Sequence, residues 1–92
     1  MNNFNIEISS TAEKDLDSLE KKDCERILKK LKKIKKDPIR FIERLAGHTL
    51  YKLRCGDYRV IIRIDTSREM LQIVMVDHRK NVYKRLQKAV RD

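Results

Sequence analysis

The chain has 92 residues and is strongly basic, with 23 Lys and Arg against 14 Asp and Glu and a formal net charge of +9. Its length predicts a single domain, residues 1–92, near the small end of those that fold on one core. The positive balance favours an anionic partner, with nucleic acid first, an acidic protein second and an anionic membrane surface third. No apolar run approaches the roughly 20 residues that span a bilayer, and no secretory signal is evident, so we expect a cytoplasmic protein.

The residue patterns of the common enzyme classes are missing from the sequence. There is no glycine-rich phosphate loop and no Ser or Cys nucleophile in a recognisable setting. The two cysteines, Cys24 and Cys55, stand alone, without the paired spacing or the neighbouring histidines of a metal site. We therefore expect reduced, mainly structural thiols, no metal ion and no cofactor.

The first elements are predicted to be a strand and a helix. Residues 4–8, Phe-Asn-Ile-Glu-Ile, alternate between apolar and polar, which is typical of a strand with one buried face. Ser10 and Glu13 have the spacing of a capping box. They predict a helix that buries Leu16 and Leu19 on one face.

A second helix is predicted between Asp23, a capping residue, and Pro38, which stops it. Apolar residues at helical spacing form its buried stripe: Cys24, Ile27, Leu28, Leu31 and Ile34. Its outer face is densely basic and carries Lys29, Lys30, Lys32, Lys33, Lys35 and Lys36. A solvated helix face explains these lysines at least as well as a binding surface, although clustered charge also steers a protein towards a large polyanion.

Residues 50–65, LYKLRCGDYRVIIRID, predict a β-hairpin. Gly56 and Asp57 suit a two-residue turn, which pairs Arg54 with Arg59 and makes one face apolar. A three-residue turn would mix the two faces, as any one-residue slip does. The opposite face then gathers four cations: Lys52, Arg54, Arg59 and Arg63. Like charges opposite one another destabilise a sheet, so this face is either solvated, with its guanidinium groups splayed apart, or a site for a polyanion.

The last third predicts one more strand and a helix. Residues 39–48 carry apolar side chains that we expect to pack, with Gly47 turning into the hairpin. Residues 70–76 are apolar on both faces apart from Gln72, which predicts a strand covered on both sides. Polar residues follow, and Val82 and Leu86 indicate a final short helix. The predicted fold is α+β, with two layers in the order β-α-α-β-β-β-α: a helical hairpin on a four-stranded, mainly antiparallel sheet.

The residues that could carry chemistry are mainly cationic: the four on the hairpin, then His78, Arg79 and Tyr83 just beyond the last strand. This set suits cleavage of RNA by its own 2′-hydroxyl, because the substrate brings the nucleophile. The protein then need only orient it, move protons and stabilise negative charge on the phosphate. A lysine crowded by cations is a plausible general base, and arginine matches phosphate oxygens. Plain RNA or DNA binding explains a basic sheet face equally well.

Two strings resemble one protein family: YKLRCGDYRVI over residues 51–61, and HRKNVY over residues 78–83. Together with RLAG over residues 44–47 and the leading strand and helical hairpin, they resemble RelE-type toxins of the RelE/ParE superfamily, which belong to type II toxin–antitoxin pairs. The resemblance covers nearly the whole chain. It implies a metal-independent endoribonuclease that enters the ribosomal A site, cuts mRNA there and is held inactive by a cognate antitoxin.

The resemblance also implies which residues act. Lys52 would take part in proton transfer, Arg59 and Arg79 would stabilise the phosphate and assist the leaving group, and Tyr83 would position the mRNA. Further RNA contacts are expected from Arg54, Arg63, His78 and Lys80. The family motif often has a second lysine where this chain has Leu50. That departure leaves the general base open, with His48 and His78 as alternatives.

Two other functions fit the same fold. ParE-type toxins of the superfamily poison DNA gyrase without cutting RNA, but they generally lack the set of Arg59, Arg79 and Tyr83. A non-catalytic nucleic-acid-binding module would bind RNA and DNA duplexes with a steep salt dependence and cleave neither.

Overall fold

The computed structural model describes residues 3–45, 47 and 49–91, except for the side chains at positions 90 and 91. Its elements in chain order are β1 (Asn5–Ile8), α1 (Ser10–Asp17), α2 (Lys21–Ile34), the 3₁₀ helix η1 (Pro38–Arg40), β2 (Ile42–Arg44), β3 (Tyr51–Cys55), β4 (Tyr58–Asp65), β5 (Met70–His78) and α3 (Val82–Arg91). The strands form one sheet in the order β1-β5-β4-β3-β2. β1 pairs with β5 in parallel, and the other neighbours are antiparallel.

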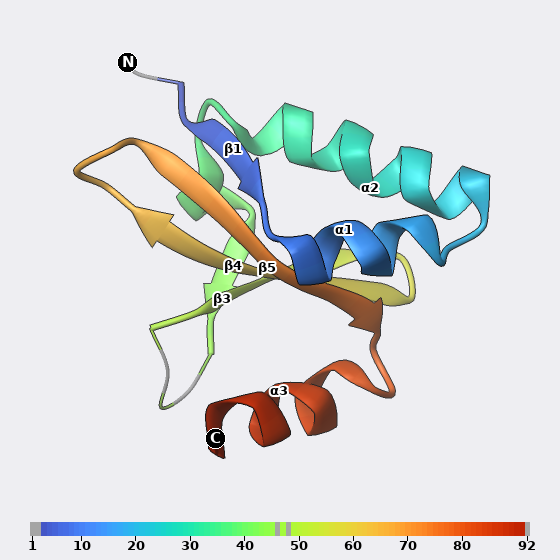
Figure 1. Ribbon diagram of the computed structural model, residues 1–92. Helices are drawn as coiled ribbons and strands as arrows, with labels where there is room; N and C mark the ends of the chain where they lie inside the picture. The colour runs from blue at the N-terminus through green and yellow to red at the C-terminus, as the bar shows by residue number, and fades with distance from the viewer. Residues whose placement is uncertain (1–2, 46, 48, 92) are drawn as a thin grey trace.

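The predicted α+β class is confirmed, with two differences in detail. Residues 42–44 form β2, a short edge strand on β3, so the sheet has five strands where we expected four. Helix α3 forms a third layer: Figure 1 shows α1 and α2 on one side of the sheet and α3 on the other. The physical reason lies in Ile61 and Met75, whose apolar side chains face away from the helical hairpin and are covered by Val82 and Leu86.

A β-bulge in β5 creates this second apolar patch. Ile61 pairs with Met75 but Ile62 pairs with Ile73, so Val74 is an extra residue on the β5 side. Strict alternation would put Met75 on the same face as Ile73. The bulge instead places Met75 in the second core while Ile73 stays in the first. The prediction that this strand is covered on both sides is therefore confirmed.

The predicted register of the hairpin is confirmed residue by residue. Arg54 pairs with Arg59 and Leu53 pairs with Val60 across the two-residue turn. Gly56 has φ +61°, a left-handed conformation that glycine adopts without steric cost. The turn therefore fixes which side chains share a face with Lys52.

Helices α1 and α2 begin earlier in the chain than the sequence predicts. Ser9, and not Ser10, caps α1: its hydroxyl accepts a hydrogen bond from the first turn at 3.0 Å and donates one to the Val74 carbonyl at 2.9 Å. The hydrogen bond to the Val74 carbonyl on β5 explains why Ser9, and not the adjacent Ser10, caps the helix. Helix α2 is flanked by Glu20 instead of Asp23. Within the described ranges, none of the helices has the length and apolar content to cross a membrane.

Candidate active site

Lys52 and Tyr83 meet on the face of the sheet that α3 covers. Lys52 is half-buried on β3, and its Nζ lies 5.7 Å from the centroid of the Tyr83 ring. Tyr83 belongs to the first turn of α3 and is 39% exposed. The Nζ also lies 3.8 Å from Oε2 of Glu43, on the neighbouring strand β2. A ring face and a carboxylate are both favourable neighbours for a positively charged side chain.

Arg59 is a diagonal neighbour of Lys52 on the same face, and such neighbours are typically about 7–8 Å apart. It is only 7% exposed. Its Nη1 donates to the carbonyls of Gly56 (3.0 Å) and Tyr58 (2.9 Å), so the guanidinium group folds back onto the hairpin turn. Arg54, directly opposite, stays exposed. The Arg59 guanidinium group is thus held by the carbonyls of the turn, whereas Arg54 is exposed to solvent.

Arg79 is held against the same turn. Its backbone N–H donates to the Asp57 carbonyl at 2.8 Å, and its Nε lies 3.7 Å from Oδ1 of Asp57. The turn therefore anchors both Arg59 and Arg79, which are 20 positions apart in the sequence. The sequence did not predict Asp57 as a partner for Arg79. The only signal for it was the position of Asp57 directly after Gly56, the turn glycine.

The predicted RNA-binding residues do not all join this group. Arg63 pairs with Gln72 at the far end of β4, about 13 Å from Arg59 at 3.3 Å per residue. There it lines a separate hollow of about 190 Å³ with Glu7 and Ser9. Lys80 is exposed just beyond β5 and stays close to Arg79 in the chain.

His78 lies on the helical-hairpin face and not on the Lys52 face. Its ring meets the Tyr58 ring edge-on, with the centroids 5.7 Å apart. Its Nδ1 accepts a hydrogen bond from the Lys80 N–H at 3.1 Å. His48, the other predicted acid or base, lies outside the described residues. No group of three or more His, Cys, Asp or Glu side chains in the described part of the chain is placed to hold a metal ion.

Arg85 connects α3 to α1 and β5 through two ion pairs, which the sequence did not predict. Its Nη2 lies 2.9 Å from Oδ1 of Asp15 on α1, and its Nη1 lies 3.1 Å from Oδ2 of Asp77 on β5. The hydrogen bond to Asp15 is the main cause that raises the pKa of Arg85. Asp15 also accepts from the Val76 N–H at 3.0 Å. This network holds the helix that carries Tyr83.

Comparisons with known proteins agree on the fold. The archaeal RelE–RelB complex from Pyrococcus horikoshii contains a chain 27% identical to this one, with a TM-score of 0.72 over 85% of this chain and 97% of that chain. The RelBE2 toxin–antitoxin complex from Mycobacterium tuberculosis gives 24% identity and a TM-score of 0.77, covering 84% and 99%. A mutant of the E. coli toxin RelE in its free state gives 23% and 0.75, covering 97% and 99%. No curated protein sequence matches the chain.

A family model places the chain more firmly than these structures do. The model described as the ParE toxin of the type II toxin–antitoxin system parDE matches residues 6–83. That range contains the hairpin, the turn that anchors the two arginines and the contact between Lys52 and Tyr83. The chain therefore belongs to this family, within the RelE/ParE superfamily, and is a toxin of a type II toxin–antitoxin system.

Proposed function

We propose that this toxin is a ribosome-dependent endoribonuclease that inhibits translation by cutting mRNA in the ribosomal A site. The observation that carries the proposal is the placement of Lys52, Arg59 and Tyr83 on one sheet face, with Arg79 tied to the same turn as Arg59. In the reaction the 2′-oxygen of a nucleotide bonds to the adjacent phosphorus while the bond from phosphorus to the 5′-oxygen breaks. The products are a 2′,3′-cyclic phosphate and a 5′-hydroxyl, and no outside reactant is needed.

We assign a role to each of these four side chains. Arg59 stabilises the negative charge on the phosphate, and Arg79 assists departure of the 5′-oxygen, since a planar guanidinium matches phosphate oxygens. Tyr83 is exposed enough to stack on a base or orient a hydroxyl. Lys52 takes part in proton transfer, with the Tyr83 ring and the Glu43 carboxylate beside its Nζ.

The cognate antitoxin, the ribosome and mRNA are the partners that this function requires. The P. horikoshii relative was solved with a RelB antitoxin, which supports an antitoxin for this chain. We expect it to be acidic where it covers the cationic sheet face and to use amphipathic helices. A cytoplasmic location follows from the proposed target.

Gyrase inhibition is the second candidate, and the match to a ParE family model favours it. Such a toxin would bind DNA gyrase and cut no RNA. The Lys52–Tyr83 contact and the anchored arginines would then have no chemical use, which is why we place the nuclease first.

Primer extension on mRNA from a translating extract distinguishes the two. We expect codon-registered cuts with the wild-type protein, none with Arg79→Ala, and unchanged cuts with Arg40→Ala, which removes the same charge from the exposed end of η1. A 2′-deoxy nucleotide at the scissile position should block cutting, because it removes the nucleophile. Growth arrest without cuts, accompanied by altered DNA supercoiling, would replace the nuclease with the gyrase poison.

A further inference from the structure

Arg59 and Asp77, two residues of the described part of the chain, carry opposite charges and lie directly opposite each other in the sheet, yet they form no ion pair. Side chains in such a position have Cβ atoms about 4.5–5.5 Å apart and share one face of the sheet. Their neighbours Tyr58 and His78 meet on the helical-hairpin face, so Arg59 and Asp77 lie on the face that α3 covers. The ion pair that Asp77 does form is with Arg85 of α3. A carboxylate within reach of the proposed phosphate-binding arginine is therefore held by another residue.

The Arg59 guanidinium group has donors to offer an anion. A guanidinium group carries five N–H donors. Within the described residues, Arg59 makes two hydrogen bonds, both from Nη1 to turn carbonyls, at 3.0 and 2.9 Å. Nε and Nη2 keep their donors for an anion, and a carboxylate and a phosphate both match this planar group. An Asp77 carboxylate bound to Arg59 would occupy the donors that the scissile phosphate needs.

Arg85 holds the Asp77 carboxylate through one of its two oxygens. Nη1 of Arg85 lies 3.1 Å from Oδ2 of Asp77, and the backbone N–H of His78 donates to Oδ1 at 2.7 Å. Asp77 is half-buried, so water replaces a lost cation poorly. If Arg85 were removed, the guanidinium group directly across the strands would be that of Arg59.

The geometry of α3 lets Arg85 do this without blocking the candidate site. Residues two apart on an α-helix point about 200° away from each other. Tyr83 thus faces Lys52, while Arg85 faces Asp77 on the other flank of the helix. On that flank Nη2 of Arg85 also lies 2.9 Å from Oδ1 of Asp15, so α1 fixes the position of the guanidinium group.

We propose that Arg85 is a positioning residue for Arg59, because it holds Asp77 and so keeps a competing carboxylate away from the arginine that binds the scissile phosphate. This role rests on the proposed function, which assigns Arg59 to the phosphate. It differs from the anchoring of α3 in one respect: loss of Arg85 is compensated by a second substitution at Asp77 and at no other partner.

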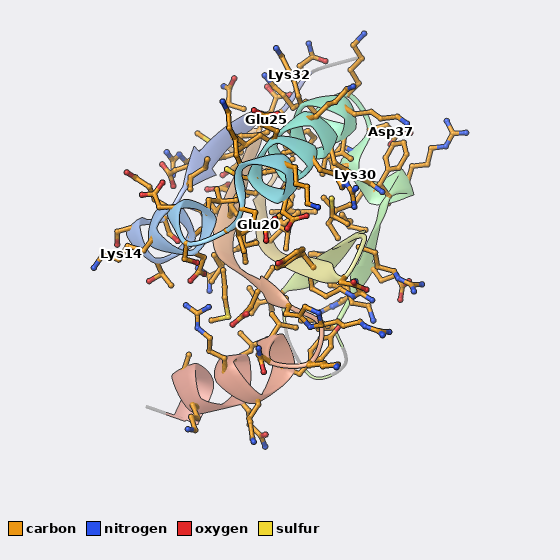
Figure 2. The ribbon with its side chains drawn as sticks, turned by 90° about the vertical axis from the view of Figure 1, so that its right-hand side faces the viewer. Lys14, Glu20, Glu25, Lys30, Lys32 and Asp37 are labelled. Atoms are coloured by element: carbon orange, nitrogen blue, oxygen red, sulfur yellow. The ribbon has the colours of Figure 1, made fainter. Side chains whose placement is uncertain are left out.

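The test compares two double variants, R85Q/D77N and R85Q/D15N. Both lose the two ion pairs of Arg85 and have the same net charge, but only the first removes the carboxylate opposite Arg59. The readouts are the rate of mRNA cutting in a translating extract and the binding of a short fluorescent RNA with methylated 2′-hydroxyls, which cannot be cut. We expect R85Q and R85Q/D15N to lose about tenfold in both, and R85Q/D77N to return to within about threefold of wild type. K14Q, which removes one charge from the outer side of α1, should match wild type (Figure 2).

Equal rates and affinities in the two double variants would overturn the proposal, because Arg85 would then only anchor α3. D77N alone, with Arg85 in place, should change binding less than about twofold. A gain as large as in the R85Q background would also overturn the proposal, because the negative charge of Asp77 would then weaken binding without any competition for Arg59.

Thermal melts of each variant set an assay temperature below every Tm. R85K keeps a cation beside Asp77 and should bind within about threefold of wild type, so a tenfold loss in folded R85K would contradict the proposal as well. The binding arm separates this inference from the nuclease. A chain that cuts no mRNA, yet recovers binding through D77N and not through D15N, keeps the role of Arg85 and loses the nuclease, whereas a chain that neither cuts nor binds RNA loses both.

Discussion

Removal of the Arg85 side chain tests whether its two ion pairs hold α3 in place. In Arg85→Gln, the Asp15 and Asp77 carboxylates lose a cation at 2.9 and 3.1 Å, respectively. Their side chains are only 14% and 26% exposed, so water replaces the arginine poorly. Hydrogen bonds to charged groups contribute about 1.5–3 kcal/mol each in protected sites. Because Arg85 itself is 35% exposed, we discount the pair to about 2 kcal/mol in total.

Thermal unfolding followed by circular dichroism measures this loss. For a domain of this size each kcal/mol corresponds to about 4–8 °C, so we expect Tm to fall by roughly 8–16 °C. Lys84→Gln, an exposed neighbour on the same helix, should change stability by less than about 0.5 kcal/mol. In a double-mutant cycle with Asp15→Asn, we expect a coupling energy of about 1–2 kcal/mol. If the effects of the two substitutions on stability were additive, the coupling energy would be zero. The ion pair between Arg85 and Asp15 would then not stabilise the packing of α3, contrary to our prediction.

Three further predictions concern the site and the thiols. Arg59→Lys should abolish most cleavage and lower the free energy of unfolding by about 1–2 kcal/mol. One ammonium group cannot reproduce the two hydrogen bonds from Nη1 to the turn carbonyls. A variant that cuts at the wild-type rate would argue against phosphate binding by Arg59. Tyr83→Leu should reduce cleavage without loss of Tm, since the ring is exposed, and Tyr83→Phe should retain more activity than the leucine variant if stacking is the main contribution. Burial raises the pKa of the Cys55 thiol, so iodoacetamide near pH 8 should label Cys24 first. If mass spectrometry showed that Cys55 is labelled first, the burial of Cys55 in the core would be contradicted.

The hairpin was predictable because its information is local. Alternation over residues 50–65 and the turn chemistry of Gly56 together allow one register, and the structure has it. The short strand β2 was not predictable in the same way. Three residues carry too little periodicity, and β2 exists because β3 offers it an edge to pair with. The bulge at Val74 is similarly hidden, since a run that is apolar on both faces looks the same with or without an extra residue.

Alternation predicts which basic side chains of the hairpin share a face, but it does not predict how they are placed. The basic residues of the hairpin follow from alternation, whereas Tyr83 was singled out by its place beyond the last strand and by the resemblance. Its contact with Lys52 depends on α3 crossing the second sheet face, which in turn depends on Ile61 and Met75. The burial of Arg59 and the pairing of Arg79 with Asp57 arise from the three-dimensional closure of the turn, which sequence periodicity does not describe.

The contact between Lys52 and Glu43 offers a way to test what the lysine contributes to cleavage. Glu43 is 67% exposed, so Glu43→Gln should fold normally while it removes the carboxylate 3.8 Å from Nζ. Lys52→Arg keeps a positive charge at the same position, but a guanidinium group does not give up its proton in proteins. If Lys52 takes part in proton transfer, Lys52→Arg should cut mRNA far more slowly than the wild-type protein, whereas Glu43→Gln should keep most of the activity. A Lys52→Arg variant with the wild-type rate would remove Lys52 from proton transfer and leave it as a fixed positive charge.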